Sequence, residues 1–229
     1  MRILAIDTAL PAVSVCVLDD GAREPVAIES IPVEKGHAEA LLPMIERVMA
    51  KVGGGFSSIG RVAVTVGPGS FTGIRIGVAA ARGIALACGV ETVGVSTLAA
   101  FAAPLLDRES DGIVATAIDA RHGNVFFSAY GPAGRVLASP RILPLREACR
   151  LLSGSRVRAA GSGAYLLREE AAAFGGDIAI LNGSPAPDIM AVARLGLAAA
   201  PENAPARPIY LKAADAQPTV QRSLPRVTS

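Results

Sequence analysis

Hydrophobic and polar positions along this chain follow a pattern that occurs twice. An apolar stretch at residues 1–7 ends in Ile-Asp and is followed by an alternating stretch at 13–17. The same order returns at 112–119 and 125–129. Two such stretches joined by a turn of small residues predict a β-hairpin. The repeat therefore predicts two similar lobes, each placing one aspartate, Asp7 or Asp119, at a corner that faces a common cleft.

Elsewhere the pattern alternates between strand and helix periodicity, which is typical of an α/β fold. Apolar positions at helical spacing predict helices at 41–52 (with Pro43 near the start), from the glycine loop to Cys88, and at 98–106, 145–152, 164–174 and 190–200. Short apolar or β-branched runs predict further strands at 24–33, 61–66, 90–95 and 157–160.

These elements predict how the chain divides. The N-terminal lobe is expected to contain residues 1–106 and 201–216, with 201–208 as the linker that returns to it. The C-terminal lobe is expected to contain residues 107–200. Residues 217–229 have no periodicity and are expected to form a mobile tail.

Composition narrows the class of protein. With 229 residues, 51% of them hydrophobic and 18% charged, the chain can bury a large core. Its 22 basic and 20 acidic residues form no basic run, so the sequence has no electrostatic signature of nucleic-acid binding. Three distant cysteines indicate a reducing compartment. No signal peptide or membrane span is expected, because the apolar stretch 74–90 contains Arg75 and Arg82, and we expect a cytoplasmic protein.

The glycine loop at residues 67–73 admits two interpretations. Ile74 stands where a phosphate-binding P-loop has its lysine, so Walker-type nucleotide hydrolysis is unsupported. The backbone N–H groups of the loop, at a helix N-terminus, suit an anion. Alternatively, the glycines serve only a tight turn between a strand and a helix.

The helix after this loop has a face of small residues, formed by Gly73, Gly77, Ala80 and Ala81. Glycine inside a helix costs about 1 kcal/mol relative to alanine. Close approach of another backbone would offset that cost. The neighbour is either this chain's own sheet or a partner chain, and the sequence alone leaves both open.

Candidate catalytic side chains are sparse. His37 and His122 form no H-x-x-x-H pair, which excludes a two-histidine helical metal site. The chain contains no G-x-S-x-G motif, and no cysteine has a catalytic signature. Asp7 and Asp119 remain as candidates to hold a Mg²⁺-bound phosphate between the lobes, or as turn residues.

Six segments, in order along most of the chain, share motifs with a known family. They are IDTA at 6–9, GHAEALLP at 36–43, VGPGSFTGIRIG at 66–77, GVSTLAA at 94–100, AIDARHGNVFFSAY at 117–130 and PIYLK at 208–212. Together they resemble the TsaB, or YeaZ, family of bacterial threonylcarbamoyladenosine biosynthesis proteins. The resemblance implies the actin-like, sugar-kinase-like and Hsp70-like ATPase fold, an α/β fold of two lobes with duplicated mixed β-sheets flanked by helices.

The resemblance also implies a role in forming N6-threonylcarbamoyladenosine at position 37 of tRNAs that read codons beginning with A. In that system TsaB pairs with TsaD, a larger paralogue that transfers the threonylcarbamoyl group, and the small ATPase TsaE joins them. TsaB alone is thought to form a homodimer, and tRNA would be bound only through the complex. TsaD holds a metal through a two-histidine motif. The corresponding segment here, residues 36–40, has only His37, so we expect a non-catalytic scaffold without a metal.

The resemblance places the pairing surface on the first two helices, at about 37–52 and 72–88. The candidate contacts are Leu42, Ile45, Met49, Phe71, Gly73, Arg75, Gly77, Ala81 and Arg82. On this interpretation, Gly77→Leu is expected to weaken the heterodimer while leaving the fold intact.

Two other functions stay open. An ATP-dependent small-molecule kinase of the same fold is favoured by the paired aspartates, but only Gly161-Ser162-Gly163 approaches an adenosine-binding motif. A peptidase is suggested only by a glycoprotease label that the family has carried. For the scaffold we expect no firmly bound cofactor, and at most weak ATP or ADP binding with Mg²⁺ in the cleft through Asp7, Thr8 and Asp119.

Overall fold

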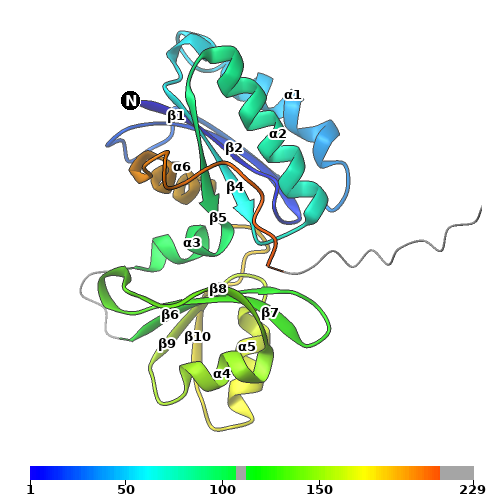
Figure 1. Ribbon diagram of the computed structural model, residues 1–229, viewed down its shortest axis with the longest axis vertical. Coiled ribbons are helices and arrows are strands. Elements are labelled where there is room, and N and C mark those ends of the chain that lie inside the picture. The colour runs from blue at the N-terminus through cyan, green and yellow to red at the C-terminus, as the bar shows by residue number, and fades with distance from the viewer. Residues whose placement is uncertain (107–111, 212–229) are drawn as a thin grey trace, which may run out of the picture.

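The computed structural model describes residues 1–106 and 112–211, which form two lobes, each built on a five-stranded sheet (Figure 1). The strands of the first sheet are β1 (Arg2–Asp7), β2 (Ala12–Asp19), β3 (Ala27–Pro32), β4 (Arg61–Gly67) and β5 (Glu91–Ser96). Those of the second are β6 (Ile113–Asp119), β7 (Asn124–Tyr130), β8 (Val136–Pro144), β9 (Val157–Ala160) and β10 (Ile178–Asn182).

The two sheets have the same topology. The strand orders are β3-β2-β1-β4-β5 and β8-β7-β6-β9-β10. In each, the first three strands form an antiparallel meander, and the last two run parallel to the central strand. The predicted duplication and the two-lobed α/β fold with duplicated mixed β-sheets are confirmed.

In the described residues, six α-helices flank the sheets. They are α1 (His37–Met49), α2 (Phe71–Cys88), α3 (Thr97–Ala102), α4 (Leu145–Leu152), α5 (Ala164–Ala172) and α6 (Ile189–Ala198). Each predicted helix is present within a few residues. Gly89, at φ 67°, ends α2 as expected, and the Ser96 hydroxyl accepts a hydrogen bond from Ala99 N at the start of α3.

The first sheet lies between two helical layers, so β1 is apolar on both faces. Leu4 and Ile6 join the core beneath α1 and α2, whereas Ile3 and Ala5 join the core beneath α6. Successive side chains of a strand point to opposite faces, and a sheet covered on both sides needs apolar residues at every position. The continuous apolar run at the start of the chain is explained by this double burial.

Helix α6 belongs to the first lobe, although we expected residues 190–200 in the second. Gly196 packs so closely on Ala63 of β4 that a Cβ would come within 2.5 Å of the Ala63 methyl group. Arg61 Nη1 donates hydrogen bonds to the carbonyls of Gly196, Leu197 and Ala199 at the end of α6. The boundary at residue 200 is therefore wrong, because the chain returns to the first sheet before α6.

In the second lobe, α4 and α5 cover one face of the sheet, and α3 lies between the lobes (Figure 1). The short helix α3 packs on β6 and β7 and also on β4 and β5. Its Phe101 is buried in one continuous apolar cluster with Leu10 of the first lobe and Ile118 and Ala160 of the second. The two lobes thus share a core.

Two details differ from the expectations, and a third is not tested. Pro43 lies inside α1 on its exposed side and not near its start, because the helix already begins at His37. Strands β8 and β10 were not predicted. The proposed tail at 217–229, and residues 212–216 of the first lobe, lie outside the described residues.

Helix α2 is long and apolar enough to cross a membrane by length and hydropathy alone. In this structure, however, it is a core helix, because Ile74, Val78, Ala81 and Ala85 are buried in the first lobe. It packs on β4, and this buried face, about a third of the helix, accounts for part of its apolar character.

Candidate functional site

The corner after β1 is formed by Asp7, Thr8 and Ala9, all of which are fully buried. Asp7 Oδ1 accepts hydrogen bonds from the backbone N–H of Ala9, at 3.0 Å, and from the Thr65 hydroxyl on the neighbouring strand β4. The first of these bonds is an Asx turn, which is the turn-residue role that the sequence left open.

Burial also sets the charge state at this corner. Asp7 Oδ2 has no hydrogen-bond partner within the described part of the chain. Desolvation raises the pKa of Asp7 above its usual value, against the opposing effects of the Thr65 hydroxyl, the Ala9 N–H and nearby His37. The His37 ring itself is hydrogen-bonded to the Leu10 carbonyl, at 2.9 Å, and so ties the start of α1 to this corner.

Asp119 makes the same local bond in the second lobe, but at an exposed position. Its Oδ1 accepts from the backbone N–H of Arg121 at 2.7 Å. Its own N–H donates to the Ser162 hydroxyl. The two aspartates therefore share a turn-forming role and differ in their access to solvent.

The glycines of the loop and of α2 pack against the Asp7 corner. A Cβ on Gly69 would overlap the Ala9 carbonyl oxygen, and one on Gly73 would overlap the Thr8 carbonyl oxygen. A Cβ on Gly77 would overlap Thr8 Oγ1, which donates a 2.7 Å hydrogen bond to the Gly73 carbonyl. The small face of α2 is therefore used inside the molecule, and Gly73, Gly77 and Ala81 are buried and cannot lie on an exposed pairing surface.

The loop itself is a tight turn, and two of its backbone donors are used within the chain. Gly67 has φ 109°, which favours glycine. Ser70 N donates to the Ala9 carbonyl, and Gly73 N donates to the Ser70 hydroxyl. Of the two interpretations of this loop, the geometry favours the turn over the anion site.

Two of the three predicted nucleotide contacts are not accessible in this conformation. Asp7 and Thr8 have no exposed surface, and Asp119 is exposed. Apolar side chains from both lobes fill the space beside the corner: Leu10, Leu98 and Phe101 meet Ile118 and Phe126 in the shared core. Asp7 and Thr8 have no surface that a nucleotide could touch in this conformation, so their role as nucleotide contacts stays a prediction that would require a different conformation. Nucleotide binding itself stays a prediction.

An open apolar groove of about 400 Å³ lies between α1 and the C-terminal half of α2. We call it the α1–α2 groove. Its lining is apolar except for Glu46 and comes from α1, the turn after it and α2: Leu42, Ile45, Met49, Ala50, Phe56 and Ile84. Leu42 is 61% exposed and Phe56 is 40% exposed, so a protein partner can reach the groove.

The structure divides the nine predicted interface residues into three groups. Leu42, Phe71, Arg75 and Arg82 are exposed on α1 and α2. Ile45 and Met49 are buried but form the floor of the α1–α2 groove. The remaining three are the inward-facing small residues of α2. Phe56 was missed because it lies beyond the end of the periodic helix pattern, directly after three glycines.

The end of the described chain, residues 201–211, crosses back over the first lobe, and we call it the C-terminal strap (Figure 1). Gly94 N donates to the Ala204 carbonyl, and Ile209 N donates to the Val66 carbonyl, both at 2.8 Å. Tyr210 then lies against the start of α2. Its ring is 4.9 Å from that of Phe71, and its hydroxyl accepts a 2.7 Å hydrogen bond from Arg75 Nε.

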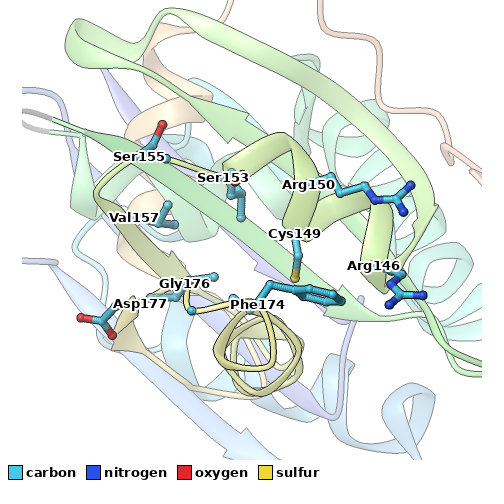
Figure 2. Close-up of a pocket in the computed structure, with 14 residues that line it drawn as sticks. Arg146, Cys149, Arg150, Ser153, Ser155, Val157, Phe174, Gly176 and Asp177 are labelled. Carbon is cyan, nitrogen blue, oxygen red and sulfur yellow. The ribbon is translucent and has the colours of Figure 1, made fainter.

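A second hollow, of about 460 Å³, lies in the outer part of the second lobe between the ends of α4 and α5 (Figure 2). Arg146 and Arg150 lie at one end and Asp177 at the other, with the Phe174 ring beside Cys149. Burial raises the pKa of Cys149 to about 11, so its thiol stays protonated at neutral pH. This cysteine is therefore a poor nucleophile.

Within residues 1–106 and 112–211, no three His, Cys, Asp or Glu side chains gather in a way that could hold a metal ion. The segment at residues 36–40 has only one of the two histidines that would hold a metal. Two of its residues, His37 and Glu39, lie at the start of α1. His37 is hydrogen-bonded to the backbone and Glu39 is exposed.

Comparison with known proteins identifies the family. A family model described as TsaD, tRNA N6-adenosine threonylcarbamoyltransferase, matches residues 31–149, just over half of the chain. The chain belongs to this family. The match runs from β3 through α4 and so includes both α1 and α2.

Relatives within this family carry the name TsaB. The chain is 41% identical over 130 residues to the tRNA threonylcarbamoyladenosine biosynthesis protein TsaB of Escherichia coli K12, which covers 57% of this chain and 55% of that protein. It is 31% identical over 131 residues to TsaB of Bacillus subtilis, with the same two coverages. The alignments span about half the length of these curated relatives.

A solved structure matches nearly the whole chain. YeaZ from Pseudomonas aeruginosa superposes with a TM-score of 0.74 and 29% identity, covering 92% of this chain and 99% of that one. The expected resemblance to TsaB and YeaZ is thereby confirmed.

The inward-facing small residues of α2 give the first prediction. From the sequence we expected Gly77→Leu to leave the fold intact, but a side chain at position 77 should instead destabilise it. Gly77→Ala should destabilise the fold by roughly 1–3 kcal/mol, because the new methyl group overlaps Thr8 Oγ1. Gly83→Ala, on the same helix, is the matched control: its Cβ meets nothing within 4 Å, and it should stabilise by about 0.5–1 kcal/mol. Urea unfolding measures both, and equal stability of the two variants would contradict the assignment.

The raised pKa of Asp7 gives a prediction about pH. A folded-state pKa above the unfolded value stabilises below about pH 4, and this contribution is lost as the pH rises through the folded-state pKa. Asp7→Asn cannot titrate, so its stability relative to the native chain should increase between pH 4 and pH 7. Thermal unfolding at both pH values tests this. Asp119→Asn, at the exposed counterpart, is the control, and a pH-independent difference for Asp7→Asn would refute the prediction.

Proposed function

We propose that this chain is a subunit of the system that forms N6-threonylcarbamoyladenosine at position 37 of tRNAs reading codons that begin with A. In this proposal it is a non-catalytic scaffold that pairs with the transferase TsaD. TsaE joins the pair, tRNA is bound through the complex, and the chain alone forms a homodimer. The TsaB and YeaZ names of its relatives and the TsaD family match support this role. A cytoplasmic location is part of the proposal, because the modification acts on tRNA.

One contrast carries the proposal. The corner that would serve a nucleotide in this fold has no exposed surface, whereas the α1–α2 groove is apolar and open. Burying apolar surface contributes about 25 cal/mol per Å² and is the main favourable term in protein association. The site that this chain offers is therefore one for another protein.

The fold holds this surface in place. The buried faces of α1 and α2 pack on the first sheet, and the two helices contact each other. A stable interface needs about 800 Å² from each partner, which is more than the groove alone supplies. The contact must therefore extend along the outward side of α2, where Phe71, Arg75, Ala79, Arg82 and Leu86 are exposed at spacings of three or four residues.

The kinase alternative is less well supported. It needs both aspartates at an open cleft, and Asp7 is fully buried in this conformation. Weak binding of ATP or ADP with Mg²⁺ remains a proposal that requires the lobes to separate. Calorimetry with millimolar ATP and Mg²⁺ on the isolated chain addresses it.

Reconstitution tests the role of the whole chain. We expect tRNA threonylcarbamoylation from threonine, bicarbonate and ATP to require this chain together with TsaD, TsaE and the enzyme that forms threonylcarbamoyl-adenylate. The chain alone should modify no tRNA and hydrolyse no ATP. Equal product without the chain would overturn the proposed role.

A single exposed residue tests the docking surface. Leu42→Asp should weaken binding to TsaD about tenfold or more, because a carboxylate in the groove must be desolvated. Isothermal calorimetry gives the affinity. Leu151→Asp, at a half-exposed leucine of α4 in the second lobe, is the matched control. Equal loss of affinity in both variants would indicate a general effect of the added charge and not a contact at the groove.

A further inference from the structure

The PIYLK segment at 208–212 is a family motif to which the proposed function gives no role. Its described residues end the C-terminal strap, and backbone contacts fix them. The Ile209 N–H bonds to Val66, and a Cβ on Gly67 would lie 2.8 Å from the Ile209 carbonyl oxygen. The strap therefore holds Tyr210 at the N-terminal end of α2. There it contacts Arg75, although the two residues are 135 positions apart in the sequence.

At this end, Phe71, Arg75 and Tyr210 form what we call the Arg75 cluster. The guanidinium carbon of Arg75 lies 3.7 Å from the centre of the Phe71 ring, and Nε donates to the Tyr210 hydroxyl. The residues Phe71 and Tyr210 remain 43% and 45% exposed. Within the described residues, neither Nη atom of Arg75 has a hydrogen-bond partner, so the outer fork of the guanidinium is available.

Charge indicates what this fork would bind. Helix α2 contains Arg75 and Arg82 and no acidic residue. A guanidinium fork matches a carboxylate with two N–H donors, and a guanidinium that is already held loses less side-chain entropy on binding. Arginine and tyrosine are also enriched among the residues that dominate interface energies. The cluster thus fits an acidic side chain on a protein surface.

We infer that the C-terminal strap is part of the docking surface and that Tyr210 positions Arg75 to bind a carboxylate of the protein partner. The inference rests on the proposed function, under which the partner is TsaD. In this arrangement Arg75 makes the contact, and Tyr210 is a positioning residue that acts through it. A second copy of the chain is the competing occupant, because Glu39 and Glu46 on α1 also present exposed carboxylates.

Calorimetry of the full chain with TsaD at two salt concentrations tests the inference. Arg75→Gln should bind about tenfold more weakly, equivalent to about 1.4 kcal/mol. Its affinity should also depend less on salt than that of the native chain, since an ion pair has been lost. Arg75→Lys should restore only part of the affinity, because lysine lacks the planar fork. Arg82→Gln is the matched control, since Arg82 is also exposed on α2 but stacks on no aromatic ring of the described residues.

Tyr210→Phe tests the positioning role, because it keeps the ring and removes the hydroxyl. It should lower affinity several-fold in the native background and have no further effect on Arg75→Gln, since residues that act through one contact are not additive. The thermal unfolding temperature of each variant should match that of the native chain, because Arg75, Arg82 and Tyr210 are all exposed.

The outcomes separate the two proposals. If the native chain does not bind TsaD, the proposed function fails. If it binds, and Arg75→Gln binds equally well, the inference alone fails. It is also overturned if Arg75→Gln weakens self-association, measured by analytical ultracentrifugation, and leaves TsaD binding unchanged. Additive losses for Arg75→Gln and Tyr210→Phe would refute the positioning role.

Discussion

The close contact between α2 and the corner after β1 determines most of what the first lobe presents to other molecules. Gly73 and Gly77 bring the helix onto Thr8, whose hydroxyl donates to the Gly73 carbonyl at 2.7 Å. Each glycine costs about 1 kcal/mol of helix propensity, and this packing offsets the cost. Because the small face points inward, Arg75, Arg82 and the exposed apolar residues of α2 must point outward. The packing of Gly73 and Gly77 on Thr8 therefore fixes which face of α2 points to solvent.

Burial at the same corner also occupies the polar groups of Asp7 within the chain. Asp7 is used for an Asx turn and a bond to Thr65, and its second oxygen is buried. Phe101 of α3 fills the space between the lobes together with Leu10 and Ile118. A hinge needs lobes that can part at low cost, whereas a continuous core resists separation. The chain is better suited to hold one surface rigidly than to open and close.

The sequence predicts the strands and helices well where periodicity is local. The duplicated hairpins follow from alternating apolar positions, and α4 is predicted with its observed bounds because its apolar face is distinct. Strand β8 escapes prediction because most of its residues are exposed. The position of α6 and the contact of Tyr210 with Arg75 are set by tertiary packing between distant residues, which no local pattern records. From the sequence alone, the small face of α2 could pack on this chain's own sheet or on a partner. The structure settles this point, because the glycines of that face pack on Thr8.

The two lobes share one strand pattern and topology, and they differ in how the corner after the first strand of each sheet is covered. In the second lobe the loop between β9 and α5 also approaches the central strand: Gly163 N donates to the Ala117 carbonyl, and Ser162 accepts from Asp119 N. Helix α5, however, spans only Ala164–Ala172 and contains no glycine, so it does not extend over the corner as α2 does. Asp119 therefore stays exposed while Asp7 is buried. The longer helix α2, with glycines on its inner face, packs directly on its corner, whereas the shorter α5 leaves Asp119 exposed.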